Sequence, residues 1–207
     1  MNHPGPHRLG ILLSGRGSNF LAIADGIAKG QLANASIAVV ISNRSDAPGI
    51  ESARQAGFAA EVIEAGGRRR AQHDAEIIAC LQSHQVDLVC LAGYMRLLSP
   101  EFVRAFPQRI LNIHPSLLPA FPGLDAQRQA LAYGVSFSGC TVHFVDEELD
   151  HGVIVLQKTV PVFSEDDESA LAARILAQEH VAYIEAIARV LSSKYCIVGR
   201  RYVPCSD

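Results

Sequence analysis

Apolar residues recur along this chain with two different periods, and the period separates the predicted strands from the predicted helices. Short apolar runs predict strands at residues 8–13, 36–42, 58–63, 86–92, 110–113, 140–145 and 153–162. Apolar positions three or four residues apart predict helices at residues 20–27, 71–82, 124–133 and 166–191. Two more helices are expected to begin at Pro48 and Pro100, with Asp46 and Ser99 as their caps.

The strand at residues 86–92 is apolar on both faces, which is typical of a central parallel strand covered by helices. The strands at residues 140–145 and 153–162 are joined by a short acidic loop, which favours antiparallel pairing. We therefore predict an α/β fold: a mostly parallel, Rossmann-like open sheet with helices on both faces and an antiparallel C-terminal extension. Residues 195–205 are expected to add a small edge strand. Because no repeat or linker interrupts the pattern, residues 1–207 are expected to form a single domain.

Polar side chains lie at the carboxyl end of the predicted strand at residues 110–113. Asn112 and His114 are two residues apart, so both side chains project to the same side, and Pro115 ends the strand. The carboxyl end of a strand in an open α/β sheet is where such sheets bind ligands. This amide and imidazole could polarise a carbonyl and move a proton, or they could be a turn residue and a structural histidine.

Ser14-Gly-Arg-Gly-Ser-Asn19 links the first predicted strand to the first predicted helix. Glycines let backbone N–H groups approach an anion at a helix start, where Ser18 or Asn19 could cap the helix or bind the same anion. The loop is neither a dinucleotide fingerprint nor a P-loop, since Phe20 replaces the third glycine and no Gly-Lys-Ser/Thr follows. It indicates either a site for a small phosphorylated metabolite or a simple tight turn.

A second loop, residues 93–98, follows the central strand with Tyr94, Met95, Arg96, Leu97 and Leu98. This composition suits a flat aromatic ligand, although the apolar side chains could instead pack under the next helix.

Composition narrows the possible functions. The chain is 49% hydrophobic and 19% charged, with a net charge of -3, so it can form a substantial core and lacks the basic surface that nucleic acid requires. Its five cysteines contain no CxxC pair and are expected to be thiols in a reducing cytoplasm. We expect no export and no membrane insertion, because the chain shows neither a signal-peptide pattern nor a sufficiently long apolar run.

Five segments occur in order: SGRGSN at 14–19, AGYMRLLSP at 92–100, NIHPSLLP at 112–119, PGL at 122–124 and ELDHG at 148–152. In their order and spacing the chain resembles the phosphoribosylglycinamide formyltransferase family of folate-dependent enzymes. The resemblance implies transfer of a formyl group from 10-formyltetrahydrofolate to the amine of glycinamide ribonucleotide during purine synthesis. It implies small-molecule substrates, no metal, and a monomer or homodimer.

The resemblance also assigns roles to residues. The family's catalytic residues fall on Asn112, His114 and Asp150. Its phosphate loop and its substrate-binding glutamate fall on Gly17, Ser18, Asn19 and Glu179. Its folate-binding positions fall on Arg70, Met95, Arg96, Leu97, Leu98, Asn112, Val145 and Asp146. In direct attack by the amine, Asn112 would donate to the oxyanion, and His114, protonated beside Asp150, would donate to the same oxygen and shuttle the proton.

The chain departs from the family at Asp125 and Gln127, where histidines are common. We expect Asp125 to point away from the phosphate or to pair with Arg128. Arg16 is either a phosphate contact or a solvated side chain.

Three alternatives stay open. Formyltetrahydrofolate deformylases share the Asn/His/Asp core but carry an N-terminal regulatory domain, for which this chain is expected to have no room. A phosphometabolite-binding domain would use the glycine loop and leave the Asn/His/Asp set unexplained. A metal hydrolase would use His114, His143, Asp150 and His151, although these residues form no compact metal-binding motif.

Overall fold

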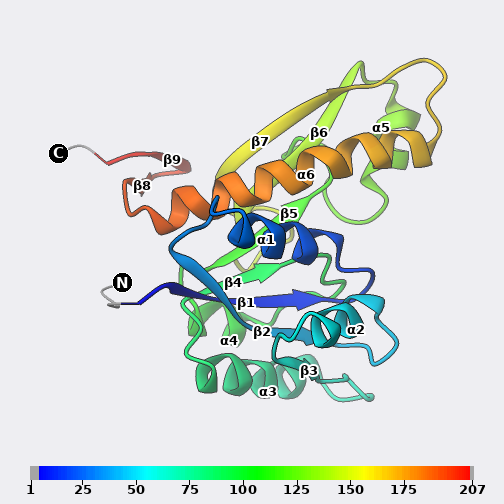
Figure 1. Cartoon of the computed structure of the whole chain (residues 1–207). Coiled ribbons are helices and arrows are strands. Elements are labelled where there is room, and N and C mark those ends of the chain that lie inside the picture. Colours follow the sequence, from blue (N-terminus) through cyan, green and yellow to red (C-terminus); the bar gives the residue numbers. More distant parts are fainter. Residues whose placement is uncertain (1–4, 206–207) are drawn as a thin grey trace. The chain divides into compact units, whose positions relative to one another are not determined.

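The computed structural model describes residues 5–205. The chain forms two compact units that divide between Leu111 and Asn112 (Figure 1).

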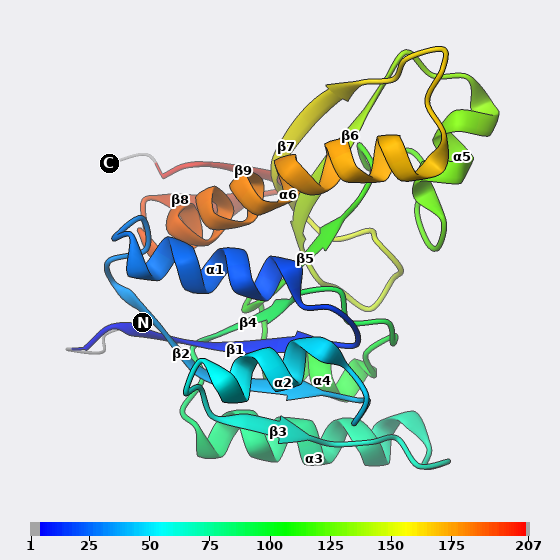
Figure 2. The same cartoon turned by 45° about the vertical axis from the view of Figure 1, so that its right-hand side comes forward.

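The first unit contains a parallel sheet with the strand order β3-β2-β1-β4. The register places Leu9 beside Ile37 on one neighbouring strand and beside Leu88 on the other. These strands are β1 (His7–Leu13), β2 (Ala35–Ser42), β3 (Ala60–Val62) and β4 (Leu88–Leu91). The helices are α1 (Ser18–Ala28), α2 (Pro48–Gln55), α3 (Arg70–Ser83) and α4 (Pro100–Ala105). In Figure 2, α1 lies on one side of this sheet and α3 and α4 lie on the other.

Close packing explains a glycine within β1. A Cβ atom on Gly10 would lie 2.5 Å from Leu81 Cδ2 on α3. An alanine here would overpack the space between strand and helix, at a cost of about 1–3 kcal/mol.

The second unit begins within β5 and has the strand order β5-β6-β7-β9-β8. Strands β6 and β7 are antiparallel, as are β8 and β9, while β9 meets β7 in parallel where Arg201 pairs with Ile154. Helix α6 runs along β6 and β7, as Figures 1 and 2 both show, and buries Leu171, Ile175 and Ile187. The strands are β5 (Ile110–His114), β6 (Phe137–Phe144), β7 (Ile154–Pro161), β8 (Tyr195–Val198) and β9 (Arg201–Pro204). The helices are α5 (Ala126–Tyr133) and α6 (Glu168–Leu191).

The predicted fold class is confirmed: parallel strands alternate with helices, and antiparallel strands follow at the C-terminal end. The expected Ser99 cap is present, since its side chain accepts from Phe102 N–H. The expected Asp46 cap is wrong, because α2 is capped by Ala47 and the Asp46 carboxylate pairs with Arg44. The single edge strand expected in the tail is a two-stranded hairpin.

Candidate active site

Asn112 and His114 lie at the end of β5, where Pro115 ends the strand as predicted. His114 is 5% exposed and Asn112 is half-buried. A histidine this deeply buried needs hydrogen-bond partners at its ring nitrogens.

His114 has an acceptor at each ring nitrogen. Its Nε2 lies 2.8 Å from Phe121 O, and its Nδ1 lies 3.3 Å from Asp150 Oδ2. A carbonyl and a carboxylate both accept, so this geometry suits a ring that is protonated on both nitrogens. Asp150 Oδ2 also accepts from Gly123 N–H at 2.8 Å. The structure thus brings His114 and Asp150 together, and a backbone group holds each of them in place.

His143, on β6, connects Asn112, the remaining predicted catalytic residue, to this pair. Its Nδ1 donates to Phe144 O at 2.8 Å, so the unprotonated Nε2 accepts from Asn112 Nδ2 at 3.2 Å. The same Nε2 lies 3.8 Å from Asp150 Oδ1. Burial lowers the pKa of His143, which agrees with a neutral ring in this position. The sequence interpretation placed His143 only among possible metal ligands. The alternation of apolar and polar residues predicted the strand β6, but it did not show that the imidazole of His143 would contact Asn112.

The loop of residues 145–152 carries Asp150. Asp146, at its start, accepts from Glu148 N–H at 3.0 Å and from His151 Nδ1 at 2.9 Å. At the neck of the loop, Phe144 N–H donates to Val153 O, and a Cβ on Gly152 would lie 1.8 Å from Phe144 O. Asp150 itself has φ 49°, a left-handed conformation that non-glycine residues seldom adopt. The loop is therefore held tightly, and it holds Asp150 in a costly backbone conformation.

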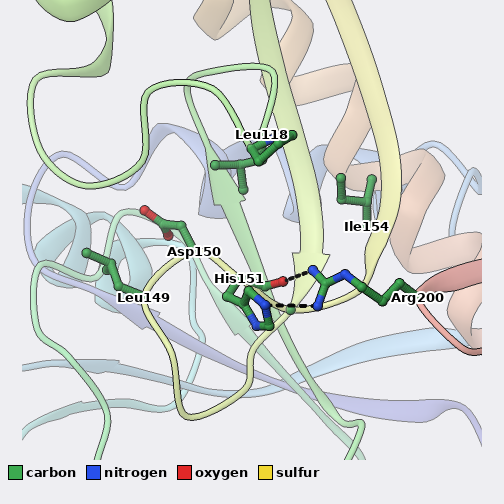
Figure 3. A pocket seen from close by; sticks show the side chains of 8 residues that line it. Leu118, Leu149, Asp150, His151, Ile154 and Arg200 are labelled. Atoms are coloured by element: carbon green, nitrogen blue, oxygen red, sulfur yellow. Dashed lines mark hydrogen bonds between the residues drawn. The ribbon is translucent and has the colours of Figure 1, made fainter.

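A pocket of about 410 Å³ opens beside Asp150 (Figure 3). Apolar side chains form much of its wall, and Asp150 and Arg200 supply charge. Its lining residues are Leu118, Pro119, Leu149, Asp150, His151, Gly152, Ile154 and Arg200. An apolar cavity with a few polar groups is typical of small-molecule sites.

In the first unit, Ser14 connects three strand ends. Its hydroxyl donates to Asn43 Oδ1 at 2.5 Å and accepts from Met95 N–H at 2.8 Å, while Ser14 N–H donates to Gly93 O. The glycine loop after β1 and the loop of residues 93–98 are therefore brought together. In the latter, Met95 and Leu97 are 68% and 51% exposed, so their apolar side chains are available to a ligand.

The glycine loop enters α1 through Gly17, whose φ is 74°. A Cβ there would lie 2.9 Å from Gly49 Cα, so the start of α2 packs directly on the loop. Of the two roles open to Ser18 and Asn19, the structure excludes capping: Gly17 is the N-cap, without a side-chain cap hydrogen bond, and both residues lie in the first helical turn. The first N–H groups of a helix have no partner within it, which suits an anion.

The other predicted site residues are dispersed. Arg16 and Arg70 are exposed in the first unit, Arg70 as the first residue of α3. In the second unit Glu179 is buried on α6, and its charge adds to the burial that raises the pKa of Cys140 to about 12. Val145 is half-buried at the start of the loop of residues 145–152.

The two departures lie at the start of α5. The expected pairing of Asp125 with Arg128 is confirmed, and Gln127 is half-buried in the first turn.

Within residues 5–205, no group of three or more His, Cys, Asp and Glu side chains is arranged to hold a metal ion. His151, a member of the metal-hydrolase set, faces Asp146 and Arg200. The five cysteines are thiols, as expected. Of the helices in the described part of the chain, none combines the length and apolar content that crossing a membrane requires.

Residues 7–187 match the family model described as formyl transferase. The phosphoribosylglycinamide formyltransferase of Escherichia coli K12 is 46% identical over 174 residues, which are 84% of this chain and 82% of that protein. The trifunctional purine biosynthetic protein adenosine-3 of Drosophila melanogaster is 46% identical over 187 residues, 89% of this chain. The chain spans 14% of that longer protein. A crystal structure of glycinamide ribonucleotide transformylase 1 from Symbiobacterium toebii superposes with a TM-score of 0.95 at 50% identity, covering 99% of this chain and 96% of that one.

Proposed function

The chain belongs to the formyl transferase family, and we propose that it transfers the formyl group of 10-formyltetrahydrofolate to the amine of 5-phosphoribosylglycinamide in de novo purine biosynthesis. The observation that carries the proposal is the buried His114–Asp150 pair, with its Nδ1 to Oδ2 distance of 3.3 Å, beside an amide oriented by His143. We further propose that residues 1–207 act as one formyltransferase domain in the cytoplasm.

The amine attacks the formyl carbon, which gives a tetrahedral intermediate with a negative oxygen and a positive nitrogen. Asn112 has two N–H groups on its amide nitrogen, and His143 accepts one of them. The other donates to the developing oxyanion. A preorganised donor of this kind is worth about 10²–10³ in rate.

Expulsion of the folate nitrogen requires a proton to pass from the attacking nitrogen to the leaving nitrogen. The protonated His114 is held at Nε2 by a strong bond to Phe121 O, whereas its 3.3 Å separation from Asp150 is long for an N–H···O bond. A substrate oxygen near Nδ1 can therefore compete for this proton while Asp150 balances the charge. Asp150 then accepts the proton of the attacking nitrogen and His114 supplies that of the leaving group, directly or through water.

The two substrates are recognised separately. Gly17, Ser18 and Asn19 bind the phosphate of the ribonucleotide at the start of α1, and Glu179 contacts the same substrate. The exposed apolar side chains on the fixed loop of residues 93–98 support folate binding there. The proposed folate contacts are Arg70, Met95, Arg96, Leu97, Leu98, Asn112, Val145 and Asp146.

The test is a time course of tetrahydrofolate release by the purified chain, with the ribonucleotide present or omitted and with or without EDTA. Release that requires the ribonucleotide and resists EDTA supports the proposal. Equal rates with and without ribonucleotide would instead identify a deformylase. Inhibition by EDTA would favour the alternative of a metal hydrolase.

A further inference from the structure

Arg200 links the C-terminal hairpin to the loop that carries Asp150. It lies in the two-residue turn between β8 and β9, and its guanidinium reaches His151 (Figure 3). Nη2 donates to His151 O at 2.5 Å, and Nη1 lies 3.0 Å from His151 Nε2. The planar guanidinium thus holds both the backbone and the side chain of one residue, a geometry that lysine cannot reproduce.

The direction of each bond follows from the groups involved. A guanidinium only donates, so His151 Nε2 must be the acceptor and the ring proton must be on Nδ1. That proton is donated to Asp146 Oδ2 at 2.9 Å, while Asp146 Oδ1 accepts from Glu148 N–H. A continuous chain of bonds therefore runs from Arg200 through His151 to the first turn of the loop.

The hairpin is itself anchored on both sides of this loop. Arg201 pairs with Ile154, at the start of β7 just after the loop. The ring of Tyr202 packs edge-on against Phe144, the residue just before the loop, with ring centroids 5.5 Å apart. The hairpin therefore contacts the residues that flank the loop on both sides and, through Arg200, the C-terminal end of the loop itself.

This attachment matters because Asp150 immediately precedes His151 and has φ 49°. A strained residue keeps its conformation only where its surroundings over-determine it. Holding both the carbonyl and the ring of His151 restrains the position of the residue after Asp150, and so restricts the backbone rotations through which Asp150 could relax and withdraw its carboxylate from His114.

We propose that Arg200 is a positioning residue of the active site, which acts through His151 to hold the Asp150 carboxylate against His114. The inference rests on the proposed function, because it assigns Asp150 a part in formyl transfer. It makes Arg200, in the turn of the β8–β9 hairpin, a support for the active site.

Steady-state kinetics of Arg200→Gln test the inference, with Arg201→Gln as the control that removes the same charge from an exposed neighbour in the hairpin. We expect Arg200→Gln to lower kcat about 10- to 100-fold with little change in KM for the ribonucleotide. Arg200→Lys should recover little of this loss, and Arg201→Gln should resemble wild type. In an Asp150→Asn background, Arg200→Gln should cause no further loss. Equal fold-losses in both backgrounds would overturn the inference, since Arg200 would then act independently of Asp150.

A second measurement needs no substrate. The amide of Gly123 donates to Asp150 Oδ2, so its hydrogen exchange, followed by NMR in the full chain, reports whether that carboxylate is in place. Faster exchange in Arg200→Gln but not in Arg201→Gln supports positioning by Arg200 even if wild type proves unable to transfer formyl groups. Unchanged exchange in Arg200→Gln would overturn it, whatever the activity of the wild type.

Discussion

His143 Nε2 accepts a hydrogen bond from Asn112 Nδ2 at 3.2 Å, and this bond determines which way the amide of Asn112 points. With the opposite amide orientation, the Asn112 oxygen would face the lone pair of Nε2. Because Nδ1 of the same ring donates to Phe144 O, the imidazole cannot reverse its roles without losing that bond. The orientation of Asn112, the proposed oxyanion donor, therefore depends on a histidine one strand away.

This relationship predicts different results for two substitutions of His143. Glutamine can place its side-chain oxygen near the position of Nε2 and still accept from Asn112, whereas asparagine is too short and replaces only the Nδ1 side. We expect His143→Gln to retain much of the wild-type kcat and His143→Asn to lose up to about 10²-fold. Steady-state rates of formyl transfer provide the comparison. Equal losses in the two variants would argue against an orienting role.

The lowered pKa of His143 predicts a dependence of stability on pH. In the unfolded chain this histidine takes up a proton as the pH falls through its ordinary value of 6.5, while burial keeps the folded residue neutral to lower pH. As the pH is lowered, the unfolded state therefore takes up this proton before the folded state does. The free energy of unfolding decreases as the pH falls from above 6.5 to the lower pKa of the folded residue. Urea unfolding at about pH 7.5 and about pH 5.5 should show a smaller decrease for His143→Gln than for wild type. An identical decrease would mean that His143 does not contribute.

Asp150→Asn tests the charge of the proposed ion pair. Asparagine keeps an oxygen that can accept from Gly123 N–H, but it cannot balance a protonated His114. We expect kcat to fall about 10²-fold or more, with KM for the ribonucleotide little changed. Asp25→Asn, the same change at an exposed aspartate on α1, is the control. A wild-type rate in Asp150→Asn would show that formyl transfer does not need the negative charge of Asp150.

The proposed binding of phosphate by the glycine loop can be tested at Gly17 with an internal control. Gly17 and Gly30 have nearly the same left-handed conformation, with φ of 74° and 75°, but a Cβ on Gly30 would meet nothing within 4 Å. Alanine at either position carries a similar backbone cost of about 1–2 kcal/mol. Since only Gly17 packs against Gly49, we expect Gly17→Ala to raise KM for the ribonucleotide far more than KM for the folate. Gly30→Ala should change neither.

Thermal unfolding of both alanine variants should be measured first, so that the kinetics are taken well below each midpoint. A Gly17→Ala variant that raises both Michaelis constants equally would indicate a disturbed fold and not a lost phosphate site.

The spacing of apolar residues predicted much of this architecture, because it reflects which side chains of each strand or helix are buried. The apolar run before Asn112 and the proline after His114 fixed a strand end without reference to the rest of the chain. The position of Asp150 opposite His114 came instead from the family resemblance, since a left-handed aspartate in an acidic loop has no periodic signal.

Other features could not be read from the sequence because they depend on distant partners. Asp46 is of a residue type that often caps helices, yet its carboxylate pairs with the nearby Arg44. The contact between His151 and Arg200 joins residues 49 positions apart. It depends on the position of the two-residue turn between β8 and β9, which local sequence does not determine. The role of His143 depends on the register between neighbouring strands, which alternation alone leaves undetermined.

The closure of the loop neck at Gly152 has a consequence for sequence variation. Because a Cβ there would overlap Phe144 O, the narrow neck excludes every side chain, even that of alanine. In a saturation library selected for purine-independent growth, position 152 should return glycine alone. The exposed position 148, four residues earlier, should accept a broad range of residues.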